Sequence, residues 1–99
     1  MKQNAKDSSD YLDFRDKFLK SFDDEIAKIK AVSDIYDEHD YDAKHNSLLS
    51  QREILMNKLA ALEAAGKKES QEWYNVKKDI YDVDKNLLEN DKARLEYQI

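Results

Sequence analysis

Apolar side chains recur every three or four residues over three long stretches of the chain, and polar clusters separate these stretches. This spacing places the apolar side chains of each stretch on one side of an α-helix. We therefore expect helices over residues 10–36, 43–65 and 70–97, preceded by a disordered tail over residues 1–9.

The first expected helix has one strongly apolar face. All three phenylalanines of the chain lie on it, and its other side carries acids placed four residues before lysines, as in Asp13/Lys17. Such pairs are typical of a solvated helix face. The face expected to pack contains Tyr11, Phe14, Phe18, Leu19, Phe22, Ile26, Ile29 and Val32.

The second expected helix has a seam of leucines and clear boundary signals. Asp42 or Asp40 can cap its first turn, and Gly66 suits the left-handed conformation that ends many helices. Arg52 occupies a seam position, where its stem could lie along the core and present the guanidinium at the edge. The seam comprises Leu48, Leu55, Leu59 and Leu62, with Leu49, Ile54 and Met56 beside it.

The third expected helix, which Ser70 can cap, carries the widest apolar stripe. Its seam contains Trp73, Val76, Ile80, Val83 and Leu87, and Tyr74, Tyr81 and Leu88 form a second row about 100° round the helix. Since one seam is enough for one neighbour, we expect this helix to contact two neighbours at once. The seam weakens after Leu88, where Asn90 would either fix the register or lie exposed at a fraying end.

Together these segments predict an all-α fold in which residues 10–99 form a single domain. An antiparallel three-helix bundle with long, coiled-coil-like helices is the expected arrangement. The alternative is an extended helical hairpin, in which the second and third helices run almost continuously through Gly66.

Composition narrows the possible functions. The 99 residues are 39% charged and contain no proline, one glycine and no cysteine, so disulfides and thiolate chemistry are excluded. Neither a membrane span nor a signal peptide is evident, which predicts a cytoplasmic location, with export by a route without a cleaved signal as the alternative. The net charge of −5 and the lack of a basic face predict no direct binding to nucleic acid.

The segment 37–42, with the sequence DEHDYD, concentrates the acidic residues. His39 and His45 lie in or near it, and two imidazoles with carboxylates could hold a divalent metal ion. The spacing fits neither an HExxH motif nor a calcium-binding loop, so we expect a solvated turn and neither metal nor cofactor. The three arginines, Arg15, Arg52 and Arg94, could bind an anion if they converged, but their spacing favours solvated positions.

Residues 76–94 resemble the first helix of the all-helical chorismate mutases. Lys77 stands where that family has an arginine, and Asn90 and Asp91 replace two core leucines. The family's other helices, with their catalytic positions, have no counterpart in the residues after Arg94, so we expect no enzymatic activity. The matching residues are Ile80, Val83, Asp84, Leu87, Leu88 and Arg94.

Trp73 and the chain length resemble the small secreted WXG100 proteins, which carry Trp-x-Gly between two helices. Here Tyr74 and Asn75 follow the tryptophan, and a Tyr-x-x-x-Asp pattern lies in mid-chain at Tyr36 to Asp40. The resemblance implies a secreted helical protein. The alternative is that Trp73 anchors the start of the third helix in the core.

We expect a non-enzymatic protein that binds another protein or a second copy of itself, as a chaperone, adaptor or inhibitor of a larger complex. Aromatic side chains beyond the needs of a thin core are typical interface anchors. An acidic inhibitor that mimics nucleic acid and a WXG100-like protein are the alternatives. The residues expected to bind the partner are Tyr74, Tyr81, Leu88, Tyr97 and Ile99.

Overall fold

The computed structural model describes the backbone of residues 2–98 and the side chains of residues 16–98. Three helices account for almost all of it: α1 (Lys2–Ser33), α2 (Tyr41–Ala64) and α3 (Gln71–Gln98). The described part contains no strand. The predicted all-α class is therefore confirmed.

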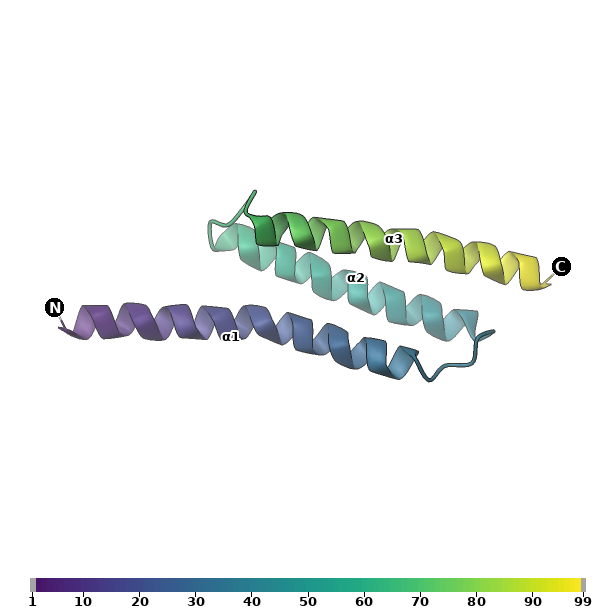
Figure 1. The fold of residues 1–99 in the computed structure, drawn as a ribbon, viewed down its shortest axis with the longest axis horizontal. Coiled ribbons are helices and arrows are strands. Elements are labelled where there is room, and N and C mark those ends of the chain that lie inside the picture. Colours follow the sequence, from purple (N-terminus) through teal and green to yellow (C-terminus); the bar gives the residue numbers. More distant parts are fainter. Residues whose placement is uncertain (1, 99) are drawn as a thin grey trace.

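The helices form an antiparallel bundle with α2 in the middle (Figure 1). α1 and α3 both pack along α2, whereas within the described residues no Cα atom of α1 lies within 8 Å of one of α3. The molecule is accordingly long and flat, with extents of 69 × 26 × 14 Å. The expectation that the third helix contacts two neighbours is wrong for the described residues of this chain, among which α3 packs on α2 and not on α1.

Local signals set the ends of α2. The carboxylate of Asp40 accepts a hydrogen bond from the Ala43 N–H (3.1 Å), which satisfies an amide that has no partner inside the helix. At the other end Gly66 has φ +74°, and the N–H of Lys67 donates to the Leu62 carbonyl (2.8 Å). The chain reverses here, so the continuous-hairpin alternative does not hold.

The first helix differs most from its expected bounds. It begins at Lys2 rather than near Asp10, so residues 2–9, expected to be a disordered tail, are helical. It ends at Ser33 instead of Tyr36, where tight turns take over: the N–H of Tyr36 donates to the Ser33 carbonyl (3.1 Å). Carboxylates placed after Ser33 oppose the negative end of the helix dipole, which favours this early end. In Figure 1 the N-terminal part of α1 extends beyond the connection between α2 and α3.

A narrow core runs along both sides of α2. Trp73 packs against it, as expected, and its indole N–H donates to Glu63 (3.1 Å). Phe18 and Val32, expected in the packing face of the first helix, are instead about half exposed. The buried apolar residues are Leu19, Ile26, Leu55, Leu59, Leu62, Val76, Ile80 and Val83.

Three polar residues are also buried on α2: Ser47, Gln51 and Lys58. The Lys58 ammonium lies 2.8 Å from the Asp23 carboxylate of α1, and the Gln51 amide donates to Ser47 (3.3 Å). A middle helix has neighbours on two sides, so polar positions that would be solvated on an outer helix become covered. Lys58 therefore joins α1 to α2 by an ion pair.

The C-terminal half of α3 is held by polar contacts where its apolar seam stops. The Asn90 amide donates to the Tyr41 carbonyl (3.0 Å), and Arg94 lies 3.1 Å from the Asp42 carboxylate. The Tyr97 ring stacks on His39, with ring centroids 4.1 Å apart. Of the two expectations for Asn90, the structure favours the register-fixing one.

Candidate functional site

A regularly spaced row of exposed apolar side chains lies along α3 and is here called the α3 row. It consists of Tyr74, Tyr81, Leu88 and Leu95, which follow one another at intervals of seven residues. They are 52%, 67%, 71% and 63% exposed. Seven residues are almost two helical turns, so the four side chains lie on one side of the helix, about 10 Å apart along it.

The α3 row points away from the core because the seam already occupies the other side of the helix. Val76, Ile80 and Val83 are buried against α2, and each member of the row lies about 100° from a seam position. The backbone under the row is therefore held in place, because the opposite side of the same helix is buried in the core.

The structure brings together Tyr74, Tyr81 and Leu88 as the sequence predicts, and it adds Leu95. The seven-residue spacing from Leu88 indicates Leu95 as a fourth member of the row. The expectation that this helix end frays left Leu95 out of the predicted binding residues. Tyr97 does not belong to this row, since it stacks on His39 at the seam side of α3. Ile99 lies outside the described residues.

The two sides of the α3 row differ in charge. On one side, Asp84 lies 2.7 Å from Arg52 of α2, and Asp91 lies 3.6 Å from His45. Arg52 therefore presents its guanidinium at the edge of the core, as its seam position predicts. On the other side lie the exposed lysines Lys78, Lys85 and Lys92.

These three lysines have no ionic partner within the described part of the chain. Among the described residues, no carboxylate oxygen lies within 4.0 Å of any of their ammonium nitrogens. The row is therefore bordered on this side by three lysines that form no ion pair with a described residue, although the chain as a whole is acidic.

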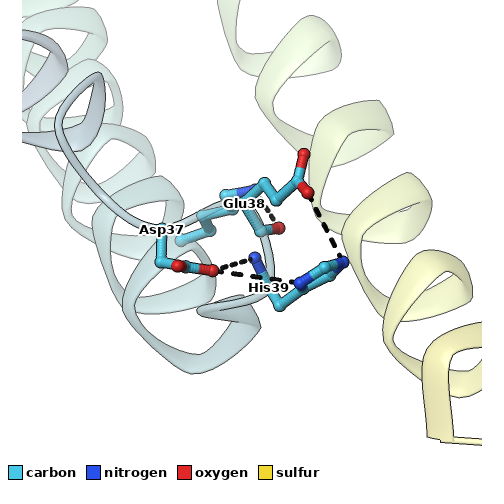
Figure 2. A network of polar contacts seen from close by, with 4 residues as sticks. Asp37, Glu38 and His39 are labelled. Carbon is cyan, nitrogen blue, oxygen red and sulfur yellow. Dashed lines mark hydrogen bonds and ion pairs between the residues drawn. The ribbon is translucent and has the colours of Figure 1, made fainter.

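The acidic turn carries no comparable site. Figure 2 shows that the His39 ring lies between the carboxylates of Asp37 (3.9 Å) and Glu38 (3.8 Å). His45 instead faces Asp91 on α3. Across the described residues no three His, Cys, Asp or Glu side chains gather as a metal site would require.

Of the three arginines, the two whose side chains the structure describes, Arg52 and Arg94, do not converge on an anion site. Arg52 and Arg94 pair with different carboxylates, Asp84 and Asp42, which lie on different helices. The side chain of Arg15 lies outside the described residues.

A groove of about 350 Å³ runs between α1 and α3, over Gln51 and Leu55 of α2. It exists because the two outer helices do not meet. Its apolar floor residues Ile26, Leu55 and Val83 are already buried in the core. The groove therefore offers a partner far less apolar surface than the α3 row does.

None of the helices that the structure describes has a stretch long and apolar enough to cross a bilayer. No family model matches the chain, and no curated protein or solved structure shows significant similarity to it. The assignment of a function thus depends on the geometry of the surface.

Proposed function

We propose that this chain is a non-enzymatic binding protein that engages another protein through the α3 row. The observation that carries the proposal is the exposure of four regularly spaced apolar side chains on the helix whose opposite side forms the core. Such a row contributes little to the stability of the monomer, because its side chains remain in water.

The size of the row supports an interface. Half-exposed side chains of this size each leave roughly 100 Å² accessible, so the row offers about 400 Å² of apolar surface. An apolar patch of that size on a small protein is often functional. If a partner also covered the polar residues that border the row, the buried surface area would reach the lower range found in specific protein interfaces.

The arrangement suits a helical partner. From Tyr74 to Leu95 the row is about 30 Å long and one side chain wide, because the rise of a helix is about 1.5 Å per residue. Amphipathic helices bind such strips through apolar side chains at matching three-, four- and seven-residue intervals.

The test compares the wild-type chain with the double variant Tyr81→Gln/Leu88→Gln in affinity capture from an extract of the native host. Glutamine is a good helix former, so the variant keeps the backbone and loses the apolar surface. The matched control is Val32→Gln/Ile35→Gln, which removes two exposed apolar side chains, one in the last turn of α1 and one in the turn that follows it.

We expect quantitative mass spectrometry to detect a protein that the wild type and the control capture and the α3 variant loses. Circular dichroism verifies that all three chains are equally helical. Equal capture by the α3 variant and the wild type would show that the row is not the binding surface.

A further inference from the structure

We infer that the α3 row docks an acidic amphipathic helix of another protein, and that Lys78, Lys85 and Lys92 select it. The inference rests on the proposed function and adds the chemistry of the partner. It concerns one face of α3, defined here as the α3 row together with these three lysines.

The lysines repeat in step with the row. Tyr74, Tyr81 and Leu88 are each followed four residues later by a lysine, so three consecutive heptads share the pattern of an apolar residue, three others and a lysine. Residues four apart are neighbours on a helix surface, and the lysines are displaced by about 40° from the row. Each of these three apolar layers therefore has a positive charge beside it.

The acids on the opposite border of the face are engaged by α2. Asp84 forms an ion pair with Arg52, and Asp91 lies 3.6 Å from the His45 ring. The lysines have no such partner among the described residues. A partner helix with carboxylates at seven-residue intervals complements the face, since it can pair with the lysines while its apolar side chains cover the row.

A flat anionic membrane surface fits the same face less well. Asp82, Glu89 and Glu96 are exposed about 100° round the helix from the row. A broad negative surface that approached the lysines would also approach these acids. A single helix, about 10 Å wide, can lie over the row and the lysines with these acids at its margin.

A second copy of the chain also fits less well. In an antiparallel pair of α3 helices, the lysine rows of the two copies would face each other, and like charges oppose association. In a parallel pair, the lysines would compete with Arg52 and His45 for Asp84 and Asp91. The charges on the face thus favour a different, acidic chain.

The experiment uses the full chain and two fluorescent helical peptides of four heptads. Both peptides carry leucine at seven-residue intervals, one flanked by glutamates and the other by lysines at the same positions. Fluorescence anisotropy measures the binding of each to the wild type, to Lys78→Glu/Lys85→Glu/Lys92→Glu and to the neutral variant Lys78→Gln/Lys85→Gln/Lys92→Gln. The control Lys17→Glu/Lys20→Glu/Lys68→Glu makes the same change in net charge away from α3.

We expect the wild type and the control to bind the acidic peptide and to discriminate against the basic one. The neutral variant should bind the acidic peptide about tenfold more weakly, and the glutamate variant should prefer the basic peptide. The neutral variant keeps the test valid even if the glutamate variant loses helix content, which circular dichroism measures.

Several outcomes would overturn the inference. If the wild type bound both peptides with equal affinity, the row would still be an apolar interface, but the lysines would not select an acidic partner. Binding of neither peptide, or binding to vesicles of phosphatidylcholine and phosphatidylserine in place of the peptides, would exclude an acidic helix as the partner. A concentration-dependent dimer that Tyr81→Gln/Leu88→Gln abolishes would assign the face to a second copy.

The failure of this inference is distinguishable from the failure of the proposed function. If the lysine variants still capture a host protein that Tyr81→Gln/Leu88→Gln loses, the α3 row binds a partner and the inferred acidity of that partner is wrong. If Tyr81→Gln/Leu88→Gln also leaves capture unchanged, both the proposed function and the inferred acidity of the partner are wrong.

Discussion

The ion pair between Asp23 and Lys58 gives a sharp test of how α1 is held on α2. The Lys58 side chain is only 10% exposed, whereas Asp23 is 58% exposed, and their charged groups lie 2.8 Å apart. Replacing Asp23 by asparagine keeps a hydrogen-bond acceptor but leaves the ammonium of Lys58 without a counter-charge in a largely buried position. Replacing Lys58 by methionine removes the buried charge and keeps a long apolar stem.

The expected magnitudes follow from this asymmetry. A fully buried pair that loses one partner costs about 3–5 kcal/mol, but water screens Asp23, and asparagine can still accept a hydrogen bond. We therefore expect Asp23→Asn to lower the free energy of unfolding by about 1–2 kcal/mol. Lys58→Met should lie within about 1 kcal/mol of the wild type, because its stem fills the same space without burying a charge.

The assay is a double-mutant cycle measured by urea denaturation with circular dichroism. Asp23→Asn should cost close to nothing in the Lys58→Met background, since no buried ammonium remains to be left unpaired. Asp24→Asn is the matched control, because Asp24 is an exposed neighbour, and its effect should stay within about 0.5 kcal/mol. An equal cost of Asp23→Asn in both backgrounds would refute the pairing and the register of α1 on α2.

Three further predictions address the core, the connection and the orientation of α3. Leu62 is fully buried (0% exposed), so Leu62→Ala should lower the free energy of unfolding by about 3 kcal/mol in urea denaturation, and a loss below about 1 kcal/mol would contradict its burial. Gly66→Ala should lower the free energy of unfolding by about 1 kcal/mol in the same assay. A Cβ at this position meets no atom within 4 Å, so the loss comes only from the positive φ (+74°). Gly66→Asn should lower it less, because asparagine tolerates this conformation better. Leu87 packs against the core, whereas Leu88 is 71% exposed. Leu87→Gln should therefore lower the thermal midpoint of unfolding strongly, and Leu88→Gln should hardly change it. Similar shifts for both variants would mean that α3 is rotated about its axis relative to this structure.

The features that the sequence predicts well are local ones. The Gly66 end of α2 and the caps at Asp40 and Ser70 depend on contacts within a few residues, and the structure contains all three. The seam of α3 is equally predictable, because the 3.6-residue period decides which side chains share a face.

The features that the sequence does not reveal depend on how the helices are placed. Lys58 and Gln51 are buried because α2 has a neighbour on both sides, and no local pattern distinguishes a middle helix from an outer one. Asn90 interrupts the apolar seam, yet its amide meets the Tyr41 carbonyl across the bundle. Asn90 and Tyr41 are 49 residues apart, so their contact follows from the packing of α3 on α2. The sequence pattern alone therefore does not show that this end of α3 is held in place.

The width of the apolar stripe on α3 connects the fold to the proposed function. A helix with two apolar rows is suited to two neighbours, either two helices of one bundle or one helix of the bundle and one partner. In the structure the buried row of Val76, Ile80 and Val83 faces α2, while α1 packs on the other side of α2, and no Cα atom of its described residues lies within 8 Å of α3. The α3 row is therefore a packing surface without a partner inside the described part of the chain. A helix of another protein that bound there would occupy the place of the second neighbour, and it would complete the packing of α3 without any rearrangement of α1 or α2.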